Sequence, residues 1–168
     1  MINIRQEQSG DIAAIDDVNR AAFETAGEAS LVRALREQAK PVVSLVAADG
    51  DRVIGHIMFS PVTLTSHPEV RIMGLAPMAV TPARQGQGVG SALVRAGLDE
   101  CRRLGVDAVV LVGHAEFYPR FGFVPASRFR LGSEYDVPDD VFMAIELVDG
   151  ALRGKAGVIR YHAAFAGL

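Results

Sequence analysis

The feature that most constrains this chain is a glycine-rich segment, Arg84-Gln85-Gly86-Gln87-Gly88-Val89-Gly90-Ser91. It follows a predicted strand over 71–80 and opens a predicted helix over 88–104. The first amides of a helix have no internal partner and carry the positive end of the helix dipole, so they bind anions well. Glycine also leaves room for a phosphate to approach the backbone. The segment therefore predicts a phosphate-binding turn; the alternative is a plain connection that binds nothing.

The surroundings of this segment narrow the choice of phosphate ligand. A Walker A loop requires a lysine followed by serine or threonine, and no lysine is present here. A dinucleotide fingerprint has a different glycine spacing and places its ribose-binding acid at the end of the next strand. The acid at about the right distance, Asp107, stands instead at the beginning of the predicted strand 108–112. A nicotinamide dinucleotide is therefore a weak rival, and a mononucleotide stays open as an alternative.

The preceding strand carries Pro77 within Leu75-Ala76-Pro77-Met78-Ala79-Val80. Proline cannot donate a hydrogen bond into a sheet, so a bulge or splay is expected in this strand. The backbone groups of Met78 and Val80 are then free to pair with an extended ligand that carries amides. The pantetheine arm of coenzyme A is such a ligand, and its pyrophosphate would reach the start of the next helix. The alternative is an edge strand with a tolerated proline.

Hydrophobic periodicity and turn residues predict the remaining strands and helices. Asp11 is the expected N-cap of the first helix, and Gly105 is expected to end the long helix that the glycine-rich segment opens. The predicted strands cover 2–6, 44–48, 53–64, 71–80, 108–112 and 142–148, and the predicted helices cover 12–23, 28–38, 88–104 and 116–121. This order predicts an α/β architecture with a mixed sheet and helices on both faces. The tail, 149–168, shows no clear period, and its role stays open.

Composition describes an ordinary globular protein. Of the 168 residues, 49% are apolar and 22% are charged, and this length fits a single domain over residues 1–168. The net charge of −3 argues against nucleic-acid binding, and the absence of long apolar runs argues against a membrane protein. The N-terminus has no apolar core of signal-peptide length, so a cytoplasmic location is expected.

The single cysteine, Cys101, excludes an internal disulfide framework and a cysteine-based zinc cluster. It falls in a helical stripe with Val94, Leu98 and Leu104, so a buried apolar role is favoured over that of an acyl-accepting nucleophile. His114-x-Glu116 matches part of a zinc deaminase signature, but the Pro-Cys-x-x-Cys partner of that signature is missing. No metal site is expected.

Gln85-x-x-Gly88-x-Gly90 resembles the Gln/Arg-x-x-Gly-x-Gly/Ala signature of GNAT N-acetyltransferases, and Glu116 to Phe123 resembles the family's Tyr-x-x-x-Gly-Phe segment. The resemblance covers 2–148 and is closest to a small bacterial subgroup often labelled YhbS-like. It implies a mostly antiparallel central sheet of six or seven strands, flanked by helices, with a splay after the bulged strand 71–80. It also implies direct attack of an amine on acetyl-CoA, without an acyl-enzyme. The implied acetyl-CoA site consists of Met78, Ala79, Val80, Arg84, Gln85, Gly86, Gln87, Gly88, Val89, Gly90 and Ser91.

The same resemblance places a general-acid tyrosine at Tyr118. A phenol near the sulfur can protonate or hydrogen-bond the thiolate as it leaves. Pro119 permits a helix here only in its first turn, which keeps Tyr118 near the helix start, beside the end of the preceding strand. The alternative is that Tyr118 is a core aromatic residue, the role that we expect for Phe117, Phe121 and Phe123.

The base that would neutralise the amine is harder to identify. The candidates are Glu24, Glu28, His114 and Glu116. Glu28 lies in the segment between the first two helices, which borders the acceptor cleft in the family, and His114 ends a buried strand where the sheet should open. These two are the favoured catalytic candidates beside Tyr118. A solvated glutamate, a capping histidine and relay of the proton by water all stay open.

The sequence thus predicts an enzyme that transfers an acetyl group from acetyl-CoA to a primary amine of a small molecule or a protein. A catalytically silent acetyl-CoA-binding module is the alternative, and a homodimer stays open as the assembly. Carboxylates on both sides of the acceptor cleft would favour a cationic acceptor. The alternative is that these carboxylates are solvated or are neutralised locally by Arg128 and Arg130. The carboxylates on the two sides of that cleft are Glu24, Glu28, Glu134, Asp136, Asp139 and Asp140.

Overall fold

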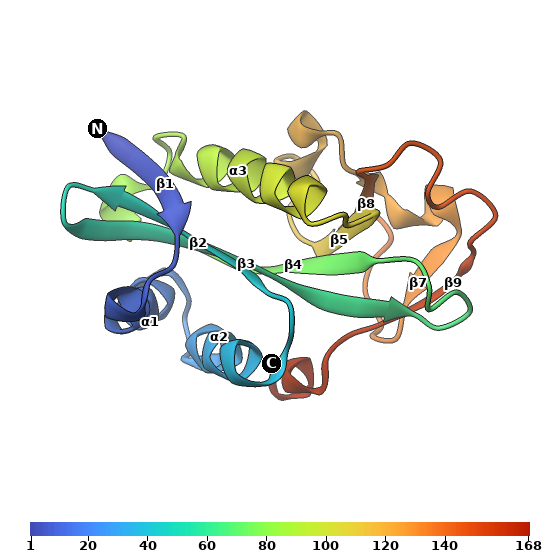
Figure 1. Cartoon of the computed structure of the whole chain (residues 1–168), viewed down its shortest axis with the longest axis horizontal. Coiled ribbons are helices and arrows are strands. Elements are labelled where there is room, and N and C mark those ends of the chain that lie inside the picture. The colour runs from blue at the N-terminus through green and yellow to red at the C-terminus, as the bar shows by residue number, and fades with distance from the viewer.

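Nine strands form one sheet with the central order β1-β2-β3-β4-β5-β8-β6, and this computed structural model describes all 168 residues (Figure 1). β7 and β9 pair with each other, and β9 joins the sheet through the end of β3. The β4–β5 and β7–β9 pairings are parallel, and the others are antiparallel. The strands are β1 (Ile2–Gln6), β2 (Val43–Asp49), β3 (Arg52–Leu64), β4 (Ile72–Val80), β5 (Ala108–Val112), β6 (Val124–Pro125), β7 (Leu131–Ser133), β8 (Phe142–Glu146) and β9 (Gly157–Arg160). The mostly antiparallel mixed sheet confirms the predicted fold class.

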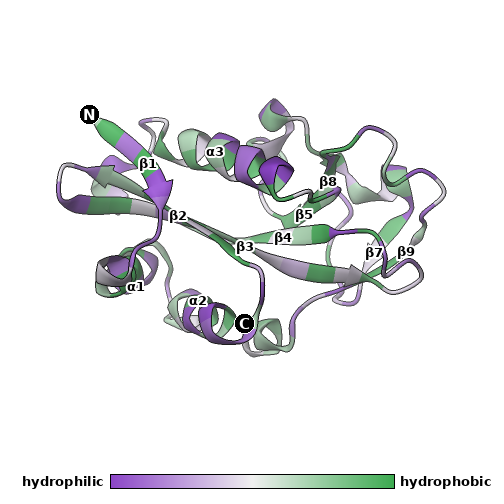
Figure 2. Ribbon diagram, in the orientation of Figure 1, coloured by the Kyte–Doolittle hydropathy of each residue, from purple (hydrophilic) through white to green (hydrophobic).

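Helices cover both faces of the sheet. α3 lies on one face, and α1 and α2 lie on the other (Figure 1). Figure 2 shows hydrophilic and hydrophobic positions along each of these helices, as expected for helices that bury one side against a sheet. The α-helices are α1 (Ile12–Ala22), α2 (Gly27–Gln38) and α3 (Val89–Arg103), and the 3-10 turns are η1 (Ser9–Asp11), η2 (Pro82–Arg84), η3 (Tyr118–Phe121), η4 (Ala126–Phe129) and η5 (Ala163–Gly167).

Alternation along β3 divides the core between the two faces of the sheet. Ile57 and Phe59 belong to the cluster that α3 covers, whereas Met58 belongs to the cluster that α1 and α2 cover. α3 approaches the sheet closely at Gly97, where a Cβ atom would overlap the Phe59 ring. The close approach explains why a helix interior tolerates glycine at this position.

Three of the four residues of the predicted stripe are buried in α3, and the fourth, Leu104, is half-buried directly after the helix. Val94 and Cys101 are fully buried and Leu98 is almost so. Burial raises the pKa of the Cys101 thiol to about 12. Because the thiolate is the nucleophilic form, burial disfavours a nucleophilic role for Cys101, which packs as an apolar side chain in the core.

Asp11 occupies the N-cap position of α1, as predicted, but its side chain makes no capping hydrogen bond to the helix. Its carboxylate accepts a hydrogen bond from the Gln8 amide at 2.7 Å and pairs with the Arg5 guanidinium at 2.7 Å. The hydrogen bond from Arg5 holds the pKa of Asp11 below its usual range. The 3-10 turn η1 precedes α1, so Asp11 already has helical backbone angles and its side chain serves the turn instead of the helix.

Three short strands, β6, β7 and β9, raise the total above the six or seven strands expected. β6 has two residues and β7 has three, too few to show a strand's alternation in the sequence. β9 lies in the tail, where it pairs with β3 and β7. Beyond β9 the chain crosses to α2, where Ala164 and Phe165 pack against the core on that face. The tail is therefore an integral part of the sheet and of the core.

A buried polar network ties β1, β2 and β3 to α1 and α2. Nε2 of the fully buried His56 lies 2.8 Å from Ser44 Oγ, and its Nδ1 lies 3.3 Å from Asn19 Nδ2. The Ser44 hydroxyl donates to Glu7 at 2.6 Å, and Glu7 pairs with Arg36 at 2.7 Å. Because the single hydroxyl proton goes to Glu7, the neutral His56 donates from Nε2 to Ser44 and accepts from Asn19 at Nδ1.

Acidification is expected to destabilise the protein through His56. Burial lowers the pKa of this side chain from 6.5 to about 4. Between these two pH values the unfolded chain binds a proton that the folded chain excludes. The stabilisation that neutral His56 contributes is therefore fully present well above pH 6.5 and is lost as the pH falls. We expect the free energy of unfolding to fall by about 1 kcal/mol between pH 7 and pH 5.5 on this account, measured by urea denaturation.

A pair of glutamine variants isolates this effect. His56→Gln keeps a donor for Ser44 but does not titrate, so this part of the pH dependence should disappear. His114→Gln changes an exposed side chain and should retain the full dependence. The same dependence in the parent and in His56→Gln would show that another group is responsible.

Candidate functional site

The sheet opens after Gly74. β4 and β5 pair only over Ile72–Gly74 and Ala108–Val110, and the rest of β4 pairs with β3 alone. The β3–β4 register shifts between Leu75 and Met78, where β4 has one residue more than β3 and forms a bulge at Ala76-Pro77. Both the bulge at Pro77 and the splay are confirmed. We call the gap between β4 and β5 beyond Gly74 the opening.

The backbone of β4 presents hydrogen-bonding groups to the opening. The Thr81 amide donates to a β3 carbonyl oxygen at 2.8 Å. Because successive residues of a strand point their backbone groups to opposite sides, Ala79 also faces β3, while Met78 and Val80 face the opening. The Val80 carbonyl oxygen accepts a hydrogen bond from Gln85 Nε2 at 2.9 Å. The Val80 amide and both backbone groups of Met78 therefore remain for a ligand.

The glycine-rich segment turns the chain from β4 into α3. Gly86 and Gly88 have positive φ angles of 76° and 85°, which strain any residue other than glycine. Open space surrounds both, since a Cβ atom at either position would meet nothing within 4 Å. The amides of Gly86, Gly88, Val89, Gly90 and Ser91 donate to no acceptor within the protein. A row of free amides at the positive end of a 15-residue helix suits a phosphate group.

The polar side chains of the segment bond to the protein itself. Arg84 Nη1 pairs with Asp49 Oδ2 at 2.9 Å, and Arg84 Nε donates to Gln87 Oε1 at 3.1 Å. Gln87 Nε2 in turn lies 3.4 Å from the Ala83 carbonyl oxygen. Arg84 and Gln87, which the resemblance assigns to the acetyl-CoA site, thus hold the turn in place. The free amides are what this segment offers to a phosphate.

Two apolar side chains flank the first turn of α3. A Cβ atom at Gly90 would lie 3.3 Å from Met78 Cε and 3.8 Å from Phe117 Cζ. Phe117 is half-buried and packs against the edge of the predicted core, and it also lies beside the glycine-rich segment, a contact that the sequence does not predict. Nothing in the local sequence signals this, because the contact joins residues far apart in the chain. The predicted core position is confirmed for Phe123, and Phe121 lies at the edge of the same cluster.

Tyr118 buries its ring and leaves its hydroxyl accessible. The ring contacts Phe123 with 5.8 Å between centroids and covers Gly113, where a Cβ atom would overlap it. The hydroxyl has no hydrogen-bond partner in the protein and is not enclosed by it. Burial raises the pKa of Tyr118 to about 12, so the phenol stays protonated at neutral pH. Tyr118 begins η3 and Pro119 follows it, as predicted for the first turn.

The four candidate bases differ in exposure. Glu24, His114 and Glu116 are exposed. Glu28 lies in the first turn of α2, and its Oε1 atom is buried without a hydrogen-bond partner. Because α2 covers the face of the sheet opposite α3, Glu28 and the Tyr118 ring belong to opposite faces (Figure 1). Of the four candidate bases, Glu28 is therefore the one with a buried side-chain atom.

The acidic segment, which we define as residues 134–140, is expected on the other side of the cleft and is partly neutralised. Glu134 accepts a hydrogen bond from the Tyr161 amide at 3.0 Å and lies 3.7 Å from Arg160 Nε. Both partners belong to the tail, which has no predicted role. The remaining carboxylates of the segment are exposed and form no ion pair; they are Asp136, Asp139 and Asp140.

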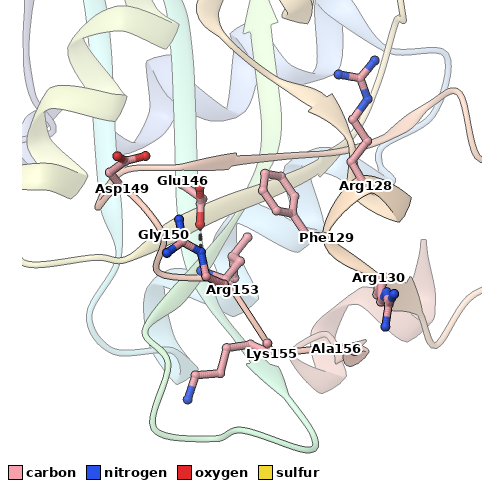
Figure 3. Close-up of a pocket in the computed structure, with 11 residues that line it drawn as sticks. Arg128, Phe129, Arg130, Glu146, Asp149, Gly150, Arg153, Lys155 and Ala156 are labelled. Atoms are coloured by element: carbon pink, nitrogen blue, oxygen red, sulfur yellow. Dashed lines mark hydrogen bonds between the residues drawn. The ribbon is translucent and has the colours of Figure 1, made fainter.

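A hollow of about 410 Å³ lies away from the opening, between η4 and the loop that follows β8 (Figure 3). Figure 3 shows that its cationic side chains point away from one another and not toward a common centre. They are Arg128, Arg130, Arg153 and Lys155. Arg128 and Arg130 line this hollow and form no ion pair with the acidic segment. The hollow therefore offers no built anion site.

Two further structural facts concern membranes and metals. No helix of the chain has the length and apolar character needed to cross a bilayer. No group of three or more His, Cys, Asp or Glu side chains is arranged to hold a metal ion.

The bulged strand, the opening and the free amides at the start of α3 define a class of proteins that hold an extended, phosphate-bearing ligand at an opened sheet. Residues 12–123 match the acetyltransferase (GNAT) family. The uncharacterized N-acetyltransferase YhbS of Escherichia coli K12 is 38% identical over 163 residues, which cover 96% of this chain and 97% of that protein. The chain belongs to the GNAT family of acetyltransferases, as the resemblance predicts.

Solved structures agree with this assignment. The structure of E. coli YhbS in complex with CoA has a TM-score of 0.92 and 37% identity, and the comparison covers 98% of this chain and 92% of that one. The structure of a GNAT family acetyltransferase from Brucella melitensis in complex with acetyl-CoA has a TM-score of 0.81 and 34% identity, with 98% of both chains covered. The fold predicted from the sequence is therefore confirmed.

Proposed function

We propose that this protein transfers an acetyl group from acetyl-CoA to a primary amine, by direct attack of the amine on the thioester in a ternary complex. The observation that carries the proposal is the continuity between the open edge of β4 and the free amides at the start of α3. An extended ligand with amides in one part and a pyrophosphate in the next matches these features in order. The complexes of the two relatives with CoA and acetyl-CoA support the same ligand here.

The pantetheine arm would lie in the opening and act as an added strand. Its amides would pair with the backbone of Met78 and with the Val80 amide. Its pyrophosphate would accept hydrogen bonds from the free amides between Gly86 and Ser91. This placement directs the thioester along β4 toward the bulge and toward Tyr118, whose ring covers the residue that follows β5.

Tyr118 is the proposed acid of the reaction. The amine nitrogen bonds to the acetyl carbon, the carbon–sulfur bond breaks, and the electron pair of that bond leaves on sulfur. A phenol with a pKa of about 12 is a weaker acid than an ordinary thiol. Complete proton transfer to the sulfur is therefore uphill, and the main contribution of Tyr118 is a hydrogen bond to the developing thiolate.

Glu28 is the proposed acceptor of the proton that the amine loses. A buried carboxylate oxygen without a partner costs free energy, and a cationic amine that pairs with it would relieve that cost. The same carboxylate would then bind the ammonium form and receive its proton. His114, although exposed, is the other proposed base, and glutamine substitution at each position distinguishes them. The larger loss of kcat identifies the base.

Cationic amines are the proposed acceptors. The exposed aspartates of the acidic segment and the buried oxygen of Glu28 lower the electrostatic potential on the acceptor side. We expect basic amines to outcompete amino acids that carry a free carboxylate, and we expect added salt to raise the KM of the basic amines. Release of the CoA thiol with a panel of acceptors measures both effects. Equal use of acidic and basic acceptors without a salt effect would exclude this preference.

Two measurements test the function itself. Calorimetry should show binding of acetyl-CoA in preference to ATP, and thiol release should depend on an added amine. Binding of acetyl-CoA without turnover of any amine would indicate a silent binding module. Preference for ATP would contradict the assignment of the glycine-rich segment to coenzyme A.

A further inference from the structure

The ring of Tyr118 lies directly against Gly113, the residue that follows β5 and begins the loop to η3. A Cβ atom at position 113 would lie 2.5 Å from Tyr118 Cε2 and 3.0 Å from Tyr118 Cδ2. Non-bonded carbon atoms attract each other best at about 3.5–4.0 Å, and shorter distances are repulsive. The ring therefore occupies the space that a side chain at position 113 would need.

The backbone at Gly113 does not itself require glycine. Gly113 is not one of the glycines with a positive φ angle, whereas Gly122, at the end of η3, has a φ angle of 103°. The Gly113 amide donates to the Val141 carbonyl oxygen at 2.9 Å, a bond that any residue other than proline could make. The close approach of the Tyr118 ring is therefore what requires a residue without a side chain at position 113.

The Tyr118 ring has little room to move away from position 113. The rings of Phe117 and Phe123 meet it edge to face, with 4.9 Å and 5.8 Å between centroids. The His114 carbonyl oxygen accepts hydrogen bonds from the amides of Phe117 and Tyr118, at 3.1 Å and 3.4 Å. These bonds tie the start of η3 to the residue that directly follows Gly113. Both the ring and its backbone are thus held close to position 113.

η3 is also braced against α3. The guanidinium carbon of Arg95, in α3, lies 5.0 Å from the centroid of the Phe121 ring, and that of Arg120 lies 4.6 Å from the centroid of the Phe117 ring. Both arginines are exposed and form no ion pair, so no carboxylate draws either one away from its ring. These contacts oppose a retreat of η3 as a unit. A side chain at position 113 would therefore be accommodated by a tilt of the Tyr118 ring.

We propose that Gly113 is a positioning residue that sets where the Tyr118 hydroxyl lies relative to the thioester. This inference rests on the proposed function, in which that hydroxyl donates a hydrogen bond to the developing thiolate. The hydroxyl has no partner in the protein, so the packing of the ring alone fixes its position. Cε2 is bonded to the carbon that carries the hydroxyl, so a tilt of the ring moves the hydroxyl. A displacement of about 1 Å can cost about 10²-fold in rate.

A double-mutant cycle between Gly113→Ala and Tyr118→Phe tests the proposal on the full chain. Gly113→Ala should lower kcat by about 10²-fold and leave the affinity for acetyl-CoA, measured by calorimetry, unchanged. In the Tyr118→Phe background the same alanine should lower kcat no further, because the hydroxyl that it displaces is absent. The phenylalanine ring meets the alanine methyl group as the tyrosine ring does. The alanine should therefore lower the thermal unfolding temperature equally in both backgrounds, and only the effect on kcat should differ.

Two further variants complete the experiment. Gly10→Ala adds the same methyl group at an exposed position of η1, where nothing lies within 4 Å of an added Cβ atom, and should keep the parent's kcat. Phe123→Leu removes a ring that contacts Tyr118 and leaves position 113 unchanged. It should lower kcat in the parent and not in the Tyr118→Phe background. If Gly113→Ala does not fold, this second cycle decides whether the packing of the ring positions the hydroxyl.

The outcomes that would overturn the proposal are distinguishable. If the losses of kcat multiply in the double variant, the substitution acts independently of the hydroxyl and the proposal is wrong. An unchanged kcat for Gly113→Ala would also overturn it, while leaving Tyr118 as the proposed acid. An unchanged kcat for Tyr118→Phe would overturn the proposed acid and this inference together. A parent that binds acetyl-CoA but releases no thiol with any amine would overturn the proposed function, and this inference with it.

Discussion

Replacement of Tyr118 by phenylalanine is expected to lower kcat by about 10²–10⁴-fold, the usual contribution of an acid that acts in the transition state. The substitution keeps the buried ring and its contact with Phe123. It removes only a hydroxyl that has no partner in the protein, so the fold should not be weakened. The affinity for acetyl-CoA should stay unchanged, because the interaction forms as charge develops on sulfur. Single-turnover kinetics with chemistry rate-limiting measures the effect.

Tyr161→Phe is the matched control. Burial raises the pKa of Tyr161 to about 12, as it does for Tyr118. Its ring, however, packs over Gly74 against the cluster that contains Val62 and Ile72, and not against the cluster that holds Tyr118. We expect this variant to keep the parent's kcat. An unchanged kcat for Tyr118→Phe as well would leave Tyr118 as a core aromatic residue only.

Replacement of Gly88 by aspartate is expected to weaken acetyl-CoA binding by about a hundredfold. Two causes act together. The carboxylate places negative charge where the pyrophosphate would lie, and the φ angle of 85° at this position strains any residue that has a Cβ atom. Calorimetry with acetyl-CoA measures the loss, and turnover should fall with it at limiting acetyl-CoA.

Gly154→Asp separates charge at the site from backbone strain. Gly154 has a φ angle of 71° and, like Gly88, nothing within 4 Å of an added Cβ atom. It lies in the loop after β8, away from the opening. This variant should lose a similar amount of stability and bind acetyl-CoA as the parent does. Normal binding by a folded Gly88→Asp variant would show that the amides at the start of α3 do not hold the pyrophosphate.

Local features of the sequence were sufficient to predict the bulge in β4 and the turn that opens α3. Pro77 indicated the bulge because a residue without an amide proton cannot complete a sheet ladder. The glycines at 86 and 88 indicated the turn because glycine, which lacks a Cβ atom, readily adopts the positive φ angles found there. Hydrophobic residues that recur every two or every 3.6 residues located the longer strands and helices, because such a repeat can be recognised within a short stretch of sequence.

The sequence did not reveal features that depend on contacts between distant segments. The placement of Phe117 against Gly90 arises where η3 meets α3. Likewise His56 is buried beside Ser44 and Asn19 because three elements converge there, and Glu28 Oε1 is buried by the packing around α2.

By itself, then, the sequence determined the fold class, the bulge and the glycine-rich turn at the start of α3, because each depends on the backbone geometry that a residue or a short pattern allows. Only the tertiary structure decided which side chains are free to act. It paired Arg84 with Asp49 and left Arg95 and Arg120 unpaired, and it buried one oxygen of Glu28 while exposing His114. Burial and pairing are set by the summed packing of elements far apart in the chain, which no single stretch of sequence contains.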